Sequence, residues 1–417
     1  MFKFIHTADI HLDSPLRGLQ RYEGAPVEEI RQATRRALEN LVELAIDQSV
    51  AFVLIAGDLY DGDWKEFRTG LFFVTQMARL REASIPVLIV AGNHDAANKM
   101  TRKLPLPENV TVLSHRKPET IRIEPCDVAI HGQGFAKAAV LDNLACQYPV
   151  ADPGLFNIGL LHTSATGREG HEPYAPCTLD DLRGRGYDYW ALGHIHKAEV
   201  VCQDPPVVFP GNVQGRSVRE TGAKGCVLVT VDDDHRADIQ PQAIDVFRWE
   251  ICRISAADIR TGEDLLDRIR DRFSQLSQSA EGRSVAVRVE IAGDCPAHRN
   301  LAAEPQRWTN EIRAVAQDVG GGVWVEKVAL ATSLPPQSQG IDALDGPVGD
   351  LVRYVEEIRS MPDKLAALAG ELADLRDKLP AELKEGPDAL GLDRPEKIGE
   401  MLEQVEPLLV QQLLRRE

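Results

Sequence analysis

The sequence predicts an α/β fold, and three of its features support this prediction. Short apolar runs alternate with helical segments from residue 1 to about residue 240. The runs at residues 51–56 and 86–91 are continuously apolar, which is typical of strands that are buried on both faces of a sheet. Polar residues follow directly after such runs, where α/β folds place their sites. We therefore expect a layered domain in which helices cover both faces of its sheet.

The elements of this first region follow from apolar spacing. Residues 30–49 repeat apolar side chains at helical intervals, from Ala33 to Ala45, and residues 70–83 are also predicted to be helical. Apolar runs predict strands at residues 2–8, 51–56, 86–91, 128–130, 156–161, 189–192, 207–209 and 226–231. The predicted boundary of this domain is 1–240.

A second region begins near residue 243 and is predicted to be a small α+β domain. A strand, a helix, a strand, a helix and a last strand are expected at residues 247–255, 263–276, 285–291, 305–317 and 323–331. The three strands are apolar enough to cover one face of a sheet. The predicted boundary of this domain is 241–333.

The third region, residues 341–417, follows a linker-like segment at residues 333–340 and is predicted to be helical. It contains 18 acidic and 10 basic residues, so it carries −8 of the chain's net charge of −17. Apolar stripes recur at helical spacing, for example from Leu365 to Leu379. Two interpretations stay open: the helices fold back on their own domain, or they form a docking surface for a partner helix.

The composition of the 417 residues excludes several classes of protein. With 43% hydrophobic and 27% charged residues, the chain is neither disordered nor fibrous. No apolar run approaches the roughly 18 residues of a membrane span, and Lys3, His6 and Asp9 interrupt the first apolar run, so no anchor or signal peptide is expected. The net charge argues against a protein that coats nucleic acid through bulk charge, although a nucleic-acid enzyme stays open. Seven dispersed cysteines indicate free thiols in a reducing cytoplasm.

Five short polar clusters each follow an apolar strand. They are Asp9-Ile10-His11, Gly57-Asp58, Gly92-Asn93-His94-Asp95, His162 and Gly193-His194-Ile195-His196. The i, i+2 pairs in the first and last clusters would point the same way on extended backbone. Each cluster supplies Asp, Asn or His to one edge of the sheet, so their joint occurrence predicts a metal site.

The predicted metal ligands are Asp9, His11, Asp58, Asn93, His162, His194 and His196. Seven nitrogen and oxygen ligands are too many for one catalytic ion and suit two ions about 3.5–4 Å apart that share a carboxylate. Because no thiolate is among them, Mn²⁺, Fe²⁺ or Zn²⁺ is expected and copper(I) is not. Such a pair polarises phosphoester oxygens and lowers the pKa of a shared water toward ~7, so hydrolysis of phosphoesters is predicted.

His94 and Asp95 are the predicted catalytic residues. His94 lies beside Asn93 but outside the ligand set, so it can donate a proton to the departing oxygen or stabilise the phosphoryl charge. Asp95 can orient the ring of His94, or it can only cap a helix. Both interpretations of Asp95 stay open.

The order and spacing of these motifs resemble the calcineurin-like metallophosphoesterase superfamily. The segments from His6 to Leu16 and from Ile55 to Trp64 are similar, more narrowly, to DNA repair exonucleases of the SbcD type and to their YhaO-like branch. The similarity covers roughly residues 1–230. It implies a four-layer sandwich of sheets flanked by helices, a second domain that caps a DNA groove, and C-terminal helices that bind an SMC-like coiled-coil ATPase. A dimer is also implied.

The resemblance further implies a role for each ligand. One metal would be held by Asp9, His11, Asp58 and His196, and the other by Asp58, Asn93, His162 and His194. Asp58 would bridge two manganese ions, and His94 would act on the transition state. Some family members carry a second catalytic histidine three residues after the bridging aspartate, where this chain has Asp61. A mechanism that needs two histidines is therefore in doubt here.

Basic residues that follow the metal loops are the predicted contacts with DNA phosphates. They are Arg17, Arg21, Lys99, Arg102, Lys103, Lys197, Arg216 and Arg219. No aromatic–basic pattern indicates sequence specificity. The stretch from Gly211 to Ser217 looks like a P-loop, but it is one residue short between its glycines and has arginine in place of lysine, so a turn that lines the site is expected.

The predicted function is two-metal hydrolysis of DNA in repair, as an exonuclease and with endonuclease activity left open. Three alternatives compete with it. A protein serine/threonine phosphatase shares the metal core, but Gly62 and Asp95 replace the arginine and glutamate of its motifs. A phosphodiesterase for small substrates such as cyclic nucleotides leaves the residues after 230 without a purpose. An inactive scaffold is disfavoured because the ligand set is intact.

Overall fold

The computed structural model describes most of the chain. The described residues are 1–14, 27–61, 67–97, 105–165, 173–320, 322–335, 347–379, 381–384 and 390–414. The chain divides into two compact units, the first formed by Met1–Glu250 with Ala280–Ala286 and the second by Ile251–Ser279 with Val287–Glu417. Among the described helices, none is both long enough and apolar enough to cross a membrane.

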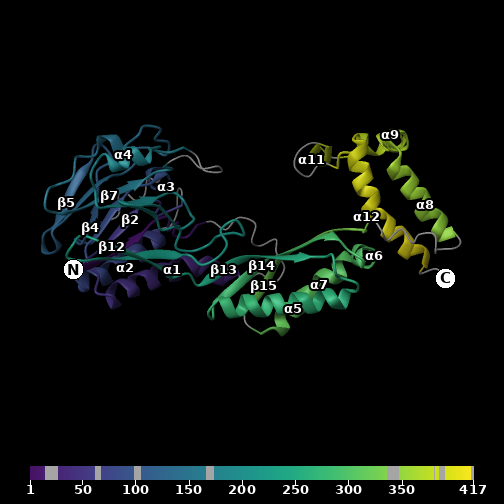
Figure 1. Ribbon diagram of the computed structural model, residues 1–417, viewed down its shortest axis with the longest axis horizontal. Helices are drawn as coiled ribbons and strands as arrows, with labels where there is room; N and C mark the ends of the chain where they lie inside the picture. Colours follow the sequence, from purple (N-terminus) through teal and green to yellow (C-terminus); the bar gives the residue numbers. More distant parts are fainter. Residues whose placement is uncertain are drawn as a thin grey trace. The chain divides into compact units, whose positions relative to one another are not determined.

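Two six-stranded sheets form the centre of the first unit (Figure 1). The first sheet has the order β12-β11-β1-β2-β3-β4, with strands at Ala237–Ala243, Gly225–Val231, Phe2–Thr7, Phe52–Ala56, Val87–Val90 and Val110–Val112. The second has the order β5-β6-β7-β8-β10-β9, with strands at Glu119–Ile123, Val128–Gln133, Phe156–His162, Tyr189–Gly193, Pro206–Phe209 and Glu199–Gln203. The strands β1 to β4 run parallel, as do β6, β7 and β8, so their carboxyl ends meet at one edge of each sheet.

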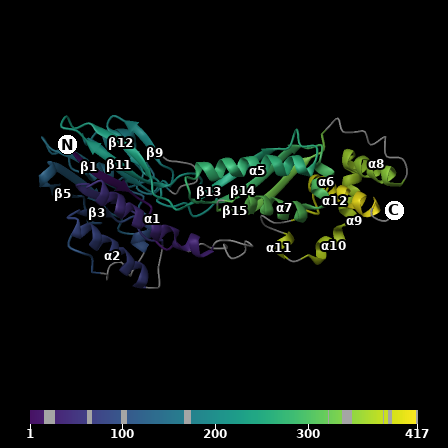
Figure 2. The same ribbon diagram turned by 90° about the horizontal axis from the view of Figure 1, so that it is seen from below.

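Apolar packing arranges this unit in four layers. The helices are α1 (Val27–Asp47), α2 (Phe67–Glu82), α3 (Asn93–Ala97) and α4 (Leu179–Arg183). Because side chains alternate along a strand, Ile5 of β1 packs with α1 and α2, which lie side by side, while Phe4 packs between the sheets (Figures 1 and 2). Phe4 stacks on Phe52 at 5.0 Å between ring centroids and meets Tyr189 of the second sheet edge-on at 5.4 Å. Trp190 on the outer face of the second sheet packs in the cluster that includes α4. The predicted fold class is confirmed.

Four strands of these sheets were not predicted from the sequence, namely β4, β5, β9 and β12. All four are outermost in their sheets. Their side chains are only partly buried, because an edge strand is exposed along one side. β12 even contains Pro241, which an edge strand tolerates. These strands therefore lack the continuous apolar run that identifies β2 or β3.

Most of a three-stranded sheet, together with its helices, belongs to the second unit. The strand order is β13-β14-β15, at Phe247–Ser255, Ser284–Asp294 and Val323–Ser333. The helices are α5 (Gly262–Ser279), α6 (His298–Ala303) and α7 (Pro305–Asp318). α7 packs against β15 and α5. The short helix α6 was not expected; otherwise the order of elements is the predicted one.

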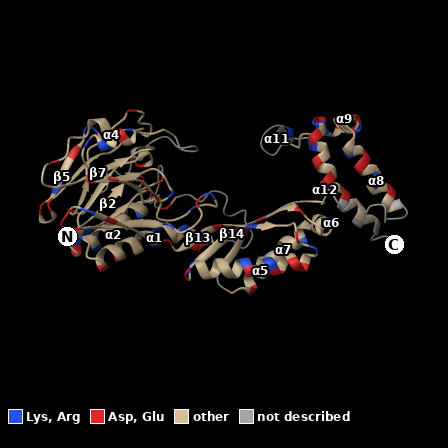
Figure 3. Cartoon of the chain, in the orientation of Figure 1, with Lys and Arg blue, Asp and Glu red and all other residues tan. Residues whose placement is uncertain are grey.

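Helices also form the C-terminal part of this unit, as predicted. They are α8 (Pro347–Ser360), α9 (Pro362–Glu371), α10 (Ala373–Lys378), α11 (Ala381–Lys384) and α12 (Pro395–Leu414), and acidic side chains are frequent along them (Figure 3). α12 packs against α8, α9 and α6, with Val352 and Val410 in a shared apolar cluster. One stripe of α12 at four-residue spacing stays exposed: Val405, Leu409 and Leu413 are 39%, 40% and 40% exposed. The helices thus fold back within their unit and keep an apolar stripe at the surface.

Candidate metal centre

The seven predicted ligands lie at the carboxyl ends of strands from both sheets of the first unit. Asp9 and His11 follow β1, Asp58 follows β2, Asn93 begins α3, His162 ends β7, and His194 and His196 follow β8. The loops after β1 and β2 are joined by their backbones: the Asp9 N–H donates to the Gly57 carbonyl and the His11 N–H to the Asp58 carbonyl, each at 3.0 Å. The His194 N–H donates to the Asp9 carboxylate at 2.9 Å. Backbone hydrogen bonds therefore fix the loops that present the ligands.

The ligand atoms form overlapping groups. Those of Asp9, His11 and His196 lie within 4.8 Å of one another, and so do those of Asp58, His162 and His194. Oδ1 of Asn93 lies 3.0 Å from Nε2 of His162. A third group of the same size joins His11, Asp58 and His94. The first two groups are compatible with two ions, while the assignment of each ligand stays a prediction.

Two glycines allow the loops to approach this closely. A Cβ atom on Gly57 would lie 2.4 Å from Nδ1 of His162, and one on Gly92 would lie 2.2 Å from Oδ1 of Asp58. Gly57 also has a φ of 90°, an angle that residues with a side chain rarely adopt. The glycines that precede Asp58 and Asn93 are therefore required by the close contacts of the site.

The expected extended backbone of the Asp9/His11 and His194/His196 pairs is wrong. Asp9 and His11 have φ values of 50° and 45°, and His194 has a φ of 103°. Asp58 also lies in the left-handed region, with a φ of 50°. Non-glycine residues adopt such angles at a cost in energy, and they cluster at functional sites. The candidate ligands converge because of these bends rather than because of strand alternation.

Hydrogen bonds determine which nitrogen two of the histidines direct to the site. Nδ1 of His162 lies 2.9 Å from the Ala56 carbonyl, so Nδ1 carries the proton and Nε2 faces Asn93. Nδ1 of His196 lies 2.7 Å from Oε1 of Glu220, so its Nε2 lone pair faces the site. That Nε2 lies 3.2 Å from Nε2 of His11. A ring held in this way by its other nitrogen is prepared to ligate a metal.

Burial and charge make these residues suitable for divalent cations. Burial lowers the pKa of His162 to about 3 and lowers that of His11 as well, so both rings are in the neutral form that ligates metal. Burial also raises the pKa of Asp58 to about 6, and a bound divalent cation would reverse that shift. Nδ1 of His11 is a buried nitrogen that has no hydrogen-bond partner among the described residues. The residues therefore fit a pair of metal ions.

His94 pairs with Asp61, a contact that was not predicted. Nδ1 of His94 lies 2.9 Å from Oδ1 of Asp61, and 39% of the His94 side chain is exposed. The hydrogen bond with Asp61 raises the pKa of His94, which favours its protonated form. Although burial alone would raise the pKa of Asp61, hydrogen bonds from His94 and Ser14 lower it to about 2. Asp61 lies at the position of a second histidine in some family members. Here its charged carboxylate supports the ring of His94.

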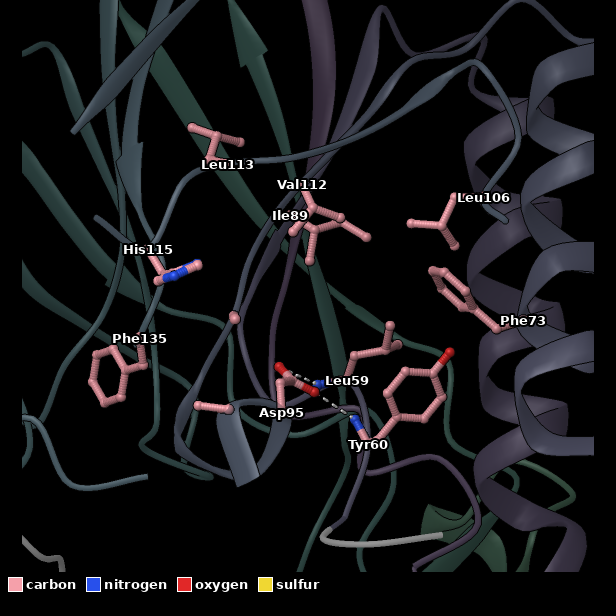
Figure 4. A pocket seen from close by; sticks show the side chains of 12 residues that line it. Leu59, Tyr60, Phe73, Ile89, Asp95, Leu106, Val112, Leu113, His115 and Phe135 are labelled. Carbon is pink, nitrogen blue, oxygen red and sulfur yellow. Dashed lines mark hydrogen bonds between the residues drawn. The ribbon is translucent and has the colours of Figure 1, made fainter. Parts of the chain in front are cut away.

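Of the two interpretations of Asp95, the structure supports a structural role. Its carboxylate accepts hydrogen bonds from the backbone N–H groups of Leu59 at 3.2 Å and Tyr60 at 3.0 Å (Figure 4). It also accepts one from the backbone N–H of Gly92 at 3.0 Å. Asp95 thereby ties the loop after β2 to the start of α3, beside a mostly apolar cavity of about 340 Å³. The predicted alternative, that Asp95 orients the ring of His94, is wrong, because Asp61 makes that contact.

The structure separates the predicted phosphate contacts into three kinds. Arg17, Arg21, Lys99, Arg102 and Lys103 lie outside the described residues. Lys197 and Arg219 are exposed, whereas Arg216 is partly buried and contacts Asp61 and Glu220. Glu220 was not predicted at all, because it follows no strand and is 24 residues from its partner His196. Only its position in the folded chain connects it with the site.

The Asp, Asn and His side chains at the strand ends are compatible with a metal-dependent phosphoesterase, and the chain belongs to the calcineurin-like metallophosphoesterase family. The calcineurin-like phosphoesterase family matches residues 2–198, and the middle domain of metallophosphoesterase YhaO matches residues 249–333. Over 297 residues the chain is 37% identical to the uncharacterized metallophosphoesterase YhaO of Bacillus subtilis (strain 168), and the alignment covers 70% of this chain and 72% of that protein.

More distant relatives include two proteins named DNA double-strand break repair protein Mre11. The protein from Sulfurisphaera tokodaii is 23% identical, and the alignment covers 69% of this chain and 75% of that protein. The protein from Methanopyrus kandleri is 24% identical, and the alignment covers 64% of this chain and 62% of that protein. Among solved structures, a dimetal phosphatase from Danio rerio aligns with a TM-score of 0.37 and 12% identity, over 58% of this chain and 96% of that one. The TT1561 protein of Thermus thermophilus aligns with a TM-score of 0.33 and 15% identity, over 58% and 98%.

Proposed function

We propose that this chain is a two-metal phosphodiesterase that cleaves DNA as an exonuclease in DNA repair, with Mn²⁺ as its metal. The observation that carries the proposal is the convergence of seven metal-ligating side chains beside the His94–Asp61 pair. The distant Mre11 relatives support DNA as the substrate. The absence of thiolates from the ligand set supports a metal such as manganese.

Each residue of the site has a defined task in this reaction. Two bound cations would supply charge stabilisation for the phosphoryl oxygens and an activated water for attack. Asp9, Asp58 and the four histidines of the ligand set would hold those cations together with Asn93. His94, which is partly exposed and protonated more readily because of Asp61, would donate its proton to the departing oxygen. Asp61 would keep the ring of His94 oriented.

The substrate can be tested with DNA of defined ends. We expect the purified chain with Mn²⁺ to release nucleotides from the ends of labelled duplex DNA, and EDTA to abolish the release. A circular single strand in parallel reveals endonuclease activity. If the protein instead hydrolyses cyclic nucleotides and leaves all DNA intact, the alternative of a small-substrate phosphodiesterase is correct and the nuclease proposal is wrong.

The exposed stripe of α12 is the proposed docking site for an SMC-like coiled-coil ATPase. We expect replacing Val405 and Leu409 with serine to weaken binding to such an ATPase by at least about 10-fold, because each side chain is a large apolar group whose burial in an interface is lost. Met361→Ser, at a residue that is 44% exposed and outside the stripe, is the matched control. Equal binding by all three proteins in a pull-down titration would refute this docking site.

Two further attributes are also part of the proposal. The family resemblance suggests a homodimer, which sedimentation of the full chain would reveal as twice the chain mass. A role in DNA repair suggests a cytoplasmic location at the nucleoid, which imaging of a tagged chain would reveal. A monomer in sedimentation would contradict the first of these attributes.

A further inference from the structure

A continuous series of polar contacts links the ligand His196 to His94. Glu220 accepts a hydrogen bond from Nδ1 of His196 through Oε1 at 2.7 Å. Arg216 donates from Nη2 to the same oxygen at 2.9 Å, and from Nη1 to Oδ2 of Asp61 at 3.4 Å. Asp61 completes the series through Oδ1, at 2.9 Å from His94. The guanidinium of Arg216 therefore contacts two carboxylates. That of Glu220 supports His196, a predicted metal ligand, and that of Asp61 supports His94, the predicted acid.

The middle of this series is held firmly by the protein. The side chains of Glu220 and Arg216 are only 13% and 19% exposed. Oε2 of Glu220 also accepts hydrogen bonds from the Arg216 backbone N–H at 2.8 Å and from Nδ2 of Asn212 at 3.0 Å. A planar guanidinium can hold two carboxylates at once because its donors form a rigid fork. Nη2 of Arg216 is thus engaged by Glu220 and Nη1 by Asp61.

We propose that Glu220 and Arg216 are positioning residues for the hydrolysis, Glu220 by fixing the ring of His196 and Arg216 by holding Glu220 and Asp61 in one arrangement. The proposal rests on the proposed function for the role of His94. It replaces the sequence-based prediction that Arg216 contacts DNA phosphate, because that guanidinium is engaged by Glu220 and Asp61. A single series of contacts, from His196 through Glu220, Arg216 and Asp61 to His94, then orients both the predicted ligand His196 and the predicted acid His94.

The role of Glu220 is tested by metal affinity, without any measurement of activity. We expect Glu220→Ala to weaken the binding of Mn²⁺ by about 10- to 100-fold, because partners that orient a ligating histidine have effects of this size. Glu220→Gln, which can still accept from His196 but lacks the charge, should lie between Glu220→Ala and the unchanged chain. Glu43→Gln, at an exposed position of α1, is the matched control. Calorimetric titration that gives Glu220→Ala an unchanged affinity would overturn this role.

The role of Arg216 is tested by separating catalysis from DNA binding. We expect Arg216→Ala to lower kcat about 10-fold or more, while KM for DNA and the salt dependence of DNA binding stay the same. Arg216→Lys should not restore kcat, because a lysine ammonium lacks the fork that spans two carboxylates. Loss of a phosphate contact would instead raise KM and reduce the slope of log affinity against log salt by about 1.

The test of Arg216 includes a control variant, a check of folding and two outcomes that would contradict the proposals. Arg236→Ala, at a side chain that is 80% exposed, is the matched control for removal of an arginine. Circular dichroism identifies a variant that fails to fold, in which case Arg216→Gln takes its place. A raised KM and a reduced salt slope with unchanged kcat would overturn the positioning role of Arg216. If the unchanged chain does not cleave DNA, the proposed function fails, whereas the metal affinities still decide the role of Glu220.

Discussion

Replacing His94 with alanine is expected to slow phosphodiester hydrolysis by about 100-fold or more while the chain keeps its full content of metal. A positioned general acid contributes a factor of this size, and the side chain is exposed enough to meet a substrate. Asp61→Asn should cause a smaller loss of about 10-fold, because it removes the charge that favours the protonated ring. Steady-state rates combined with elemental analysis of the same samples measure both quantities.

The geometry around His94 makes this experiment informative in both directions. Ligand atoms of His94, His11 and Asp58 lie within 4.8 Å of one another, so His94 could itself ligate a metal. Loss of bound metal from His94→Ala would make it a ligand and contradict its role as an acid. His235→Ala, at an exposed histidine, is the control and should keep both rate and metal content.

Replacing Asp58 with asparagine is expected to have the largest effect on metal binding. Asp58 is 2% exposed, its carboxylate is 3.5 Å from Nε2 of His162 and 4.0 Å from Nε2 of His11, and it thus lies between the two ligand groups. Removing the charge that would bridge two cations should weaken metal binding by more than about 100-fold and abolish hydrolysis. Titration with Mn²⁺, followed by elemental analysis after gel filtration, measures the loss.

The control for this variant is Asp47→Asn, at an exposed position near the end of α1. It changes the net charge by the same amount far from any ligand, so its metal content should equal that of the unchanged chain. An Asp58→Asn variant that still retains two equivalents of metal would show that this carboxylate is not shared.

The candidate ligands could be predicted from the sequence because each lies at or just after the end of an apolar strand. A strand end places its next residues at the edge of the sheet, so Asp58 and His162 can be located without knowledge of any contact. Asp61 and Glu220 could not be predicted in the same way, because their roles depend on contacts between separate loops. The pairing of Asp61 with His94 spans 33 residues of sequence, and no periodic pattern indicates it.

The limits of prediction were similar for the fold. Central strands such as β2 are buried on both faces and therefore appear as apolar runs, whereas the edge strand β12 is half exposed and its sequence alternates apolar and polar residues. The left-handed backbone of Asp9 and His11 had no signal, because neither residue is a glycine. Sequence patterns thus located the layers and the candidate ligands, while the bends that bring these side chains together depend on the packed loops.

The central claim, that two divalent cations share Asp58, is tested most directly by anomalous diffraction from crystals of the full chain grown with Mn²⁺. Two anomalous peaks are predicted, one beside Asp9, His11 and His196 and the other beside Asn93, His162 and His194, with the Asp58 carboxylate in contact with both. A single peak, or two peaks of which only one contacts Asp58, would contradict the claim.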